Sequence, residues 1–267
     1  ALHFWEEPPI SGEAGSGAIF FSACTLRCVF CQNAQISSGN FGADVSVARV
    51  AQMMLELEAQ GALNINLVTP GHFAPQVVEA VRMARDAGLS IPIVCNTGGY
   101  ETLECVRLLS QVVDVWLTDF KYASADLAAE LSRARDYPAV AAVALTAMLE
   151  SVRAHGGPAS GEDGRMLRGV IVRHLVLPGH TDDSMVVLDR VWELAGNDVD
   201  ISVMNQYTPN AAGAVTDEEY ESVLDHADDL GFERMWWQQG GTVSESFVPA
   251  FDMTGVEGPE LASRRHD

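Results

Sequence analysis

Three cysteines close together are the part of this sequence best suited to chemistry. They occupy the run Cys24-Thr-Leu-Arg-Cys28-Val-Phe-Cys31, spaced C-x3-C-x2-C, directly after the apolar residues 18–22. Thiolates are soft ligands that bind zinc or iron–sulfur clusters. A structural zinc site normally has four ligands in paired knuckles, and no second pair follows here. A [4Fe-4S] cluster usually takes four cysteines, so three would leave one iron open to another ligand.

Two simpler interpretations of the cysteines remain open from the residues alone. They could bind zinc together with a distant histidine, or be unreactive thiols in a buried turn. The chain has five cysteines without a paired framework, which argues against a secreted disulfide scaffold. It has no apolar run long enough to span a membrane and no signal-peptide pattern. We therefore expect a cytoplasmic protein that has no membrane partner.

The charge of the chain limits its partners. A formal net charge of −21 disfavours nucleic acid as a partner, because nonspecific affinity for phosphates comes from lysine and arginine. A protein that donates electrons to a cluster must approach the cysteines, and many such donors are acidic. Arg27, inside the cysteine run, could supply local positive charge for this approach, or be a solvated loop residue.

The elements that must position these cysteines alternate along the chain. Short apolar runs predict strands, and apolar residues at helical spacing predict helices between them. The predicted strands are 18–22, 64–68, 91–95, 112–117, 169–177 and 201–204. The predicted helices are 44–60, 75–87, 101–110, 123–134, 139–154, 182–195 and 216–230. We interpret 139–154 as an insertion, and Thr216 and Glu219 as a capping box.

This alternation predicts an α/β fold of parallel βαβ units. Six units are too few to close an eight-stranded barrel, so we expect an open (β/α)6 partial TIM barrel. The sequence shows no linker, which predicts one domain over residues 1–267. We expect residues 1–17 to be an irregular lead-in, and residues 254–267 to be a loose tail.

Polar or glycine-rich residues follow all six predicted strands. Functional residues gather at the carboxyl ends of strands in parallel α/β barrels. After the cysteines, these segments are Thr69-Pro-Gly-His72, Asn96-Thr-Gly-Gly99, Thr118-Asp-Phe-Lys121, Arg173-His174 with Pro178-Gly-His180, and Asn205-Gln-Tyr207. The pattern favours a site at this edge of the sheet.

The cysteine spacing, with Phe30 before the last cysteine and a strand before the first, resembles the radical S-adenosylmethionine (SAM) superfamily. Other segments are similar to uncharacterised relatives of pyruvate formate-lyase activating enzyme across nearly the whole chain. They are Trp5-Glu-Glu-Pro-Pro-Ile-Ser-Gly12, Cys31-Gln-Asn33, Asn96-Thr-Gly-Gly-Tyr100, Asp119-Phe-Lys-Tyr122, Asp136-Tyr-Pro138 and Arg173-His-Leu-Val-Leu-Pro-Gly179. The resemblance implies a [4Fe-4S] cluster on Cys24, Cys28 and Cys31 that cleaves SAM reductively to methionine and a 5′-deoxyadenosyl radical, which abstracts a hydrogen from substrate.

Several residues then become candidates for binding SAM. Arg173 could pair with the SAM carboxylate, or form a salt bridge to an acidic neighbour. Asn96 and Thr97 suit the ribose hydroxyls, or form a simple turn. The resemblance gives Asp119 and Lys121 the place of an Asp-x-Lys that faces SAM and substrate in the activating enzymes; the alternative is a surface ion pair. Phe30 belongs to the same cofactor-binding set by its place in the motif.

The sequence departs from the family pattern at two strand ends. Many members place Gly-Gly-Glu after the second strand to hold the SAM amine, whereas this chain has Thr69-Pro-Gly-His72. His72 then faces cofactor or substrate. The histidine that follows the sixth strand in the activating enzymes is replaced by Gln206 or a neighbour. These changes affect the activating function more than SAM binding.

Three functions remain open from the sequence. The first is an activating enzyme that acts on a glycine of a partner protein. The second is a small-molecule enzyme, for example an epimerase, in which Cys95 or Cys105 returns a hydrogen; the alternative for both is an ordinary buried cysteine. The third is an iron–sulfur electron-transfer protein that never cleaves SAM. For the enzymes we expect an electron donor of the flavodoxin or ferredoxin type.

Overall fold

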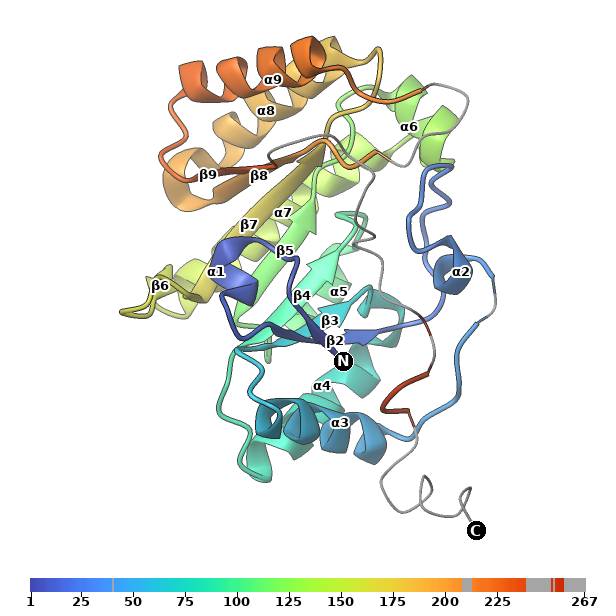
Figure 1. Cartoon of the computed structure of the whole chain (residues 1–267), viewed down its shortest axis with the longest axis vertical. Coiled ribbons are helices and arrows are strands. Elements are labelled where there is room, and N and C mark those ends of the chain that lie inside the picture. Colours follow the sequence, from blue (N-terminus) through green and yellow to red (C-terminus); the bar gives the residue numbers. More distant parts are fainter. Residues whose placement is uncertain (40, 208–212, 239–250, 252, 257–267) are drawn as a thin grey trace.

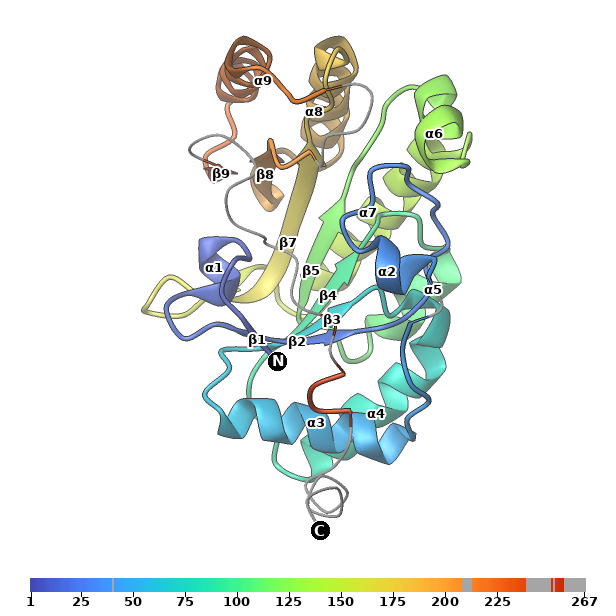
Figure 2. The same ribbon diagram turned by 45° about the vertical axis from the view of Figure 1, so that its right-hand side comes forward.

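The computed structural model describes residues 1–39, 41–207, 213–238, 251 and 253–256. One curled sheet runs in the order β1-β2-β3-β4-β5-β7-β8-β9, and β6 pairs with β7. From β2 to β9 every pairing along this path is parallel. The strands are β1 Leu2–His3, β2 Ser16–Phe20, β3 Ile65–Val68, β4 Ile93–Thr97, β5 Val115–Asp119, β6 Ala159–Ser160, β7 Met166–Leu175, β8 Asp200–Met204 and β9 Met235–Trp237. Figures 1 and 2 show the open curve, which confirms the predicted partial barrel.

Helices cover the outer side of the curve. Successive members of this layer pack against one another, from α3 through α4, α5, α7 and α8 to α9. The helices are α1 Pro8–Ser11, α2 Ala34–Ser37, α3 Val47–Ala59, α4 Ala74–Asp86, α5 Leu103–Leu109, α6 Ala125–Ser132, α7 Tyr137–Ala154, α8 Thr181–Ala195 and α9 Asp217–Leu230. Short 3-10 turns lie at Gly71–Phe73 and Gly196–Asp198.

Local signals in the sequence explain where several helices begin and end. Side chains of Ser46, Thr102 and Ser124 each accept a hydrogen bond from a backbone N–H in the first turn of α3, α5 and α6. The predicted capping box at Thr216 is present at the start of α9, and Gly231 ends that helix in the left-handed conformation.

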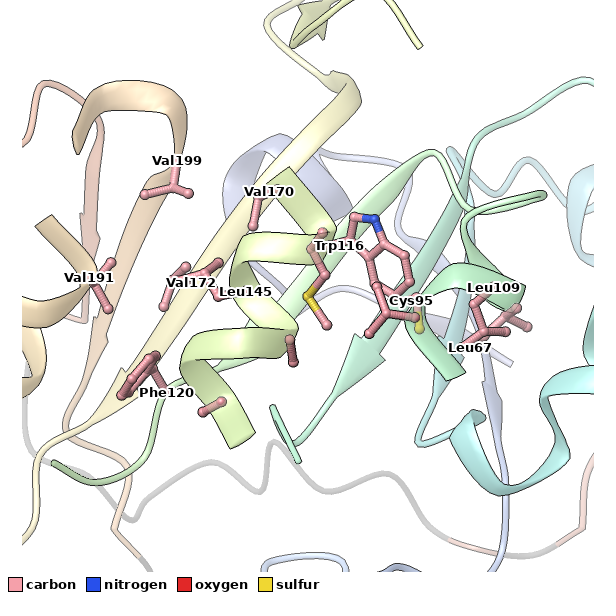
Figure 3. Close-up of a cluster of buried hydrophobic side chains, with 14 of the residues drawn as sticks. Leu67, Cys95, Leu109, Trp116, Phe120, Leu145, Val170, Val172, Val191 and Val199 are labelled. Carbon is pink, nitrogen blue, oxygen red and sulfur yellow. The ribbon is translucent and has the colours of Figure 1, made fainter. Parts of the chain in front are cut away.

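The core lies on both sides of the sheet, because successive side chains of a strand point to opposite faces. The larger cluster fills the space between sheet and helices and includes Trp116 of β5 (Figure 3). A smaller cluster, Val94, Val115, Leu117 and Ile171 with Ile10, lies on the other side. Since Ile10 comes from α1, that short helix fills the inside of the curve.

Three expectations about elements need correction. The lead-in 1–17 is not irregular: β1 pairs antiparallel with β2, and α1 packs inside the curve. The helix predicted as an insertion is α7, which packs on β7 between α5 and α8 and is therefore part of the main helical layer. A further parallel strand, β9, extends the sheet beyond the six predicted strands.

Two expectations concern residues that are partly outside the described ones. Only residues 254–256 of the expected loose tail 254–267 are described. No helix in the described parts of the chain is both long and apolar enough to cross a membrane.

Candidate active site

The cysteine loop follows β2 and is held against the end of α6. The backbone N–H of Val29 donates to the Leu131 carbonyl at 2.9 Å, and that of Arg27 donates to the Ser132 carbonyl at 3.4 Å. These two carbonyls belong to the last turn of α6, whose acceptors have no partners within the helix. The loop therefore supplies the bonds that this helix end needs, and the helix end fixes the path of the loop.

Left-handed backbone conformations gather around the same loop. Ala23 precedes the first cysteine with φ 74°, Arg133 follows α6 with φ 56°, and Thr69 follows β3 with φ 59°. Non-glycine residues adopt such values at an energetic cost, and they cluster at functional sites. The observation points to this edge of the sheet as a place of function.

The three thiols of the loop are free and partly exposed. Cys28 Sγ accepts a hydrogen bond from Ser132 Oγ at 3.0 Å, and Cys31 Sγ lies 3.3 Å from Ser37 Oγ. Burial raises the pKa of the Cys24 thiol, an effect that the Leu26 backbone N–H opposes. Each sulfur thus has a polar hydrogen near it, as metal-bound thiolates commonly do.

The donor set fits an iron–sulfur cluster better than a single metal ion. Among the described residues, no three His, Cys, Asp or Glu side chains are arranged to hold one ion. A cluster of several irons spreads its cysteines more widely than a single zinc does. Three free thiols on one loop, with hydrogen-bond donors beside them, fit a [4Fe-4S] cluster in which one iron has no protein thiolate.

An ion pair at the end of β5 lies beside this loop. Lys121 Nζ contacts Asp119 Oδ2, and both side chains are mostly buried. Burial alone would lower the pKa of Lys121, but the charges of Asp119 and Cys28 hold it well above its usual value. Lys121 therefore stays charged, and its cation lies within electrostatic range of Cys24 and Cys28.

Tyr137 connects the ends of β4 and β5. Its buried hydroxyl donates to the Gly98 carbonyl at 2.9 Å and accepts from the Lys121 backbone N–H at 2.9 Å. A side chain at Gly98 would point toward Leu26 of the cysteine loop and the Lys121 side chain. The missing side chain lets Leu26 of the loop approach the end of β4 closely. Gly98 thus lies where the cysteine loop, the ion pair and the end of β4 meet.

The other predicted SAM-binding residues occupy different parts of this edge. The exposed His72 ring contacts the Ser22 carbonyl, just before the cysteine loop, with Nε2 at 2.7 Å. Asn96 is half-buried at the end of β4, and Thr97 beside it is buried and accepts from the Gly99 N–H at 3.3 Å. The turn predicted as the alternative for Thr97 is therefore present.

The cysteine loop also reaches the end of β8. Gln32 Nε2 donates to the Gln206 carbonyl at 2.7 Å, and the Phe30 ring lies 5.6 Å from the Tyr207 ring. Phe30 itself is buried. Gln206 is therefore beside the loop, although the contact uses its backbone. Residues 208–212, which follow Tyr207, lie outside the described residues.

Arg173 has acidic partners inside the curve. Its Nε and Nη2 each lie 2.7 Å from a different oxygen of Glu7, and Nη2 also contacts Glu6. Asn66 of β3 donates to Glu6 at 2.8 Å. All these side chains are largely buried. The alternative predicted for Arg173, a salt bridge to an acidic neighbour, is the arrangement found.

The structure does not bring Cys95 to the site. Its side chain is fully buried on the helix side of β4, between Leu67, Leu109 and Trp116 (Figure 3). Strand alternation places Val94 on the inner face with Ile10, and so turns Cys95 outward. Burial raises the pKa of its thiol well above the usual value. The expectation that Cys95 could serve as a hydrogen donor is corrected accordingly.

Several residues of the site escaped sequence analysis. Tyr122, Tyr137 and Glu7 lie within the segments that carry the family resemblance, which was the available signal. Ser132 had no signal, because a serine at the end of a helix is common. Glu101 was also missed: burial raises the pKa of this carboxyl to about 7, and its Oε2 is buried without a hydrogen-bond partner.

Comparison with known proteins agrees with this geometry. The sequence model of the Radical SAM superfamily matches residues 18–191. An uncharacterised protein of Methanocaldococcus jannaschii is 27% identical over 252 residues, which covers 88% of this chain and 68% of that protein.

Solved structures share the fold. A radical SAM methyltransferase from Sphaerobacter thermophilus has a TM-score of 0.58 at 12% identity, over 84% of this chain and 66% of that one. Streptococcus suis SuiB bound to S-adenosylmethionine has a TM-score of 0.59 at 15% identity, over 84% of this chain and 47% of that one. This chain thus spans about half to two thirds of these structures. At such identities the likeness establishes the fold alone.

Proposed function

This chain belongs to the radical SAM superfamily, and from that premise we propose that it is an enzyme of the activating-enzyme type. Cys24, Cys28 and Cys31 would hold a [4Fe-4S] cluster. With SAM bound, the cluster supplies reductive cleavage of the sulfonium, which yields methionine and an organic radical able to abstract a hydrogen atom. A glycine of a partner protein is the proposed substrate.

The observation that carries this proposal is a convergence at one edge of the sheet. The cysteine loop after β2, Gly98 after β4 and the Asp119–Lys121 pair after β5 lie together. The carboxyl ends of parallel strands are where such folds place their chemistry. A protein that only carried electrons would need the thiols but not the other two features.

The residues around the loop would bind and orient the cofactor and the substrate. SAM carries an amine, a carboxylate and a sulfonium, and the paired charges of Asp119 and Lys121 offer both signs at one place. Tyr137 fixes this pair relative to Gly98 through two backbone contacts. Positioning of this kind is the main contribution of protein to such chemistry.

The proposed electron donor is supported by one feature of the cysteine loop. The cluster needs one electron at a time, which a flavodoxin or ferredoxin would supply. Arg27 is exposed on the cysteine loop and gives local positive charge to an otherwise acidic chain. Such charge supports the approach of an acidic donor.

The choice of a protein substrate rests on one resemblance and one observation. By its sequence, the Asp119-x-Lys121 segment resembles the Asp-x-Lys that faces SAM and substrate in the activating enzymes. The epimerase alternative needs a cysteine that can return a hydrogen, and Cys95 lies in the core on the far side of β4. Cys105 is half-buried on α5, where its Sγ lies 3.5 Å from the Gly71 carbonyl.

The decisive experiment is anaerobic. The protein is reconstituted with iron and sulfide, given SAM and dithionite, and assayed for 5′-deoxyadenosine. The Cys28→Ala variant should lose the product, whereas Cys105→Ala, which changes a cysteine outside the loop, should keep it. An intact cluster that releases no nucleoside from the native chain would overturn the enzymatic proposal and favour an electron-transfer protein. Release that persists in Cys28→Ala would overturn the cluster assignment.

A further inference from the structure

Two buried hydroxyls form a chain that ends on one cysteine of the loop. Tyr122 Oη lies 2.6 Å from Ser132 Oγ, and Ser132 Oγ donates to Cys28 Sγ at 3.0 Å. Tyr122 is 0% exposed and Ser132 is 1% exposed. Water therefore does not compete for these bonds.

The direction of the chain follows from counting hydrogens. A serine hydroxyl has one hydrogen and can accept through its lone pairs. Ser132 donates its hydroxyl hydrogen to the Cys28 sulfur, so Ser132 Oγ must accept the hydrogen bond that it shares with Tyr122 Oη. The tyrosine then donates to the serine, and the serine donates to the sulfur. Hydrogen bonds in such a chain polarise and strengthen one another.

Contacts at both ends of the hydroxyl chain fix its geometry. Ser132 is the last residue of α6, and its carbonyl accepts from the Arg27 N–H, one residue before Cys28. The Tyr122 ring packs edge-on against the Tyr137 ring, with centroids 5.3 Å apart. One residue, Ser132, thus holds both the backbone of the loop and the sulfur of its middle cysteine.

We propose that the Tyr122–Ser132 chain raises the reduction potential of the cluster bound at Cys28. This inference rests on the proposed function, because it requires the cluster. The reduction adds one electron and no proton, so the negative charge on the sulfurs increases. A donor to sulfur stabilises that added charge, which makes the electron easier to accept. Tyr122 and Ser132 are then positioning residues that act through Cys28.

In the part of the chain that the structure describes, neither of the other two cysteines has a buried hydroxyl as its donor. Cys31 has Ser37 at 3.3 Å, in a half-exposed place where water can compete. Cys24 has the Leu26 backbone N–H, which no side-chain substitution removes. The proposal therefore predicts that the effect of hydroxyl removal is largest at Ser132 and smaller at Ser37.

The test is a redox titration of the reconstituted protein, followed by the EPR signal of the reduced cluster. Ser132→Ala should bind electrons about tenfold less tightly, and a tenfold change equals 59 mV for a one-electron couple. Tyr122→Phe, which keeps the ring, should shift the potential in the same negative direction by less. Ser110→Ala removes a hydroxyl that donates to the Val106 carbonyl of α5, and it should not shift the potential.

A double variant separates tuning from general damage. Since Tyr122 acts through Ser132, Tyr122→Phe should add no further shift in a Ser132→Ala background. Equal shifts in both backgrounds, or unchanged potentials in the single variants, would overturn the proposal. If Ser132→Ala does not fold, the shift in Tyr122→Phe decides alone.

The same preparations distinguish this inference from the proposed function. The native protein is assayed for 5′-deoxyadenosine beside each titration. If the native protein cleaves SAM but Ser132→Ala keeps the native reduction potential, only the role of the Tyr122–Ser132 hydroxyl chain is refuted. If the native protein forms a cluster but releases no nucleoside, the enzymatic proposal is refuted. The shifts in reduction potential of the variants then still test the Tyr122–Ser132 hydroxyl chain. Failure of the native chain to form any cluster refutes both.

Discussion

Gly99 occupies a place where no side chain fits. Its φ is +79°, and a Cβ there would overlap the Asp119 carbonyl oxygen and lie 2.8 Å from Tyr137 Oη. Gly99→Ala should therefore lower the free energy of unfolding by roughly 3 kcal/mol, from backbone strain and overpacking together. Gly88→Ala is the matched control. Gly88 also has a positive φ but has nothing within 4 Å of a Cβ, so it should lose only about 1 kcal/mol. Urea unfolding measures both, and equal losses would contradict the packing argument.

Glu101 should make stability depend on pH in an unusual direction. Burial raises the pKa of its carboxyl from 4.5 to about 7, so the folded state holds a proton that the unfolded state releases first. Stability should therefore fall as pH rises from about 4.5 to about 7. Glu101→Gln should remove this fall and be more stable than the native chain at about pH 8, by about 1 to 2 kcal/mol.

Thermal unfolding at several pH values checks the prediction for Glu101. Glu104→Gln changes an exposed carboxylate on α5 and should keep the native pH profile. A Glu101→Gln variant that loses stability at about pH 8 would show that the carboxylate is stabilising.

At the scale of elements, the sequence predicted the alternation of strands and helices, but not the role of α7 or the presence of β1 and α1. The apolar residues of both core clusters recur at the spacing of a helix or a strand. Every predicted strand and helix therefore corresponds to an element of the structure. The role of α7 was misassigned because its alanine-rich pattern fits a helix in any place. The short β1 and α1 were missed because their order depends on contacts with distant strands rather than on local pattern.

The start of α9 illustrates what local signals can establish. Thr216 Oγ1 accepts from the Glu219 N–H, and the Glu219 carboxylate accepts from the Thr216 N–H. Thr216→Ala should lower the free energy of unfolding by about 1 kcal/mol. Thr146→Ala changes an exposed threonine within α7 and should leave stability nearly unchanged. Chemical denaturation of the two variants compares them, and equal effects would argue against the cap.

At the scale of the whole molecule, the site combines predictable and unpredictable parts. The thiols could be found from their spacing, and Asp119 with Lys121 because charged side chains are costly to bury at a strand end without a partner. The pairing of Arg173 with Glu7 could not be derived, because 166 residues separate them. The single domain over the full chain stays a prediction.

This long-range pair should contribute to stability above acidic pH. Burial would raise the pKa of Glu7, but the Arg173 charge and hydrogen bonds reverse this and lower it below 4.5. The stability from this group is present above about pH 4.5 and is lost as pH falls through the lowered pKa. Glu7→Gln should cost about 1 to 3 kcal/mol near pH 7, since it leaves a buried charge with one acidic partner fewer.

The measurement is urea unfolding near neutral pH and again near pH 3, where the cost of Glu7→Gln should shrink. Glu13→Gln, an exposed change in the same segment, should have little effect at either pH. A cost that does not depend on pH would argue that shape, not charge, makes Glu7 important.

The same pair has a consequence for synthesis on the ribosome. Glu7 is translated 166 residues before Arg173. At ordinary elongation rates the segment that fills the curve waits roughly 10 to 30 seconds for its partner. During that interval the carboxylates of Glu6 and Glu7 lack their native cation, and Ile10 lacks Ile171, one of its native neighbours. Strands β2 to β5 must therefore assemble around an incompletely filled inner face. The nascent chain is therefore most vulnerable to aggregation and chaperone capture until β7 emerges from the exit tunnel.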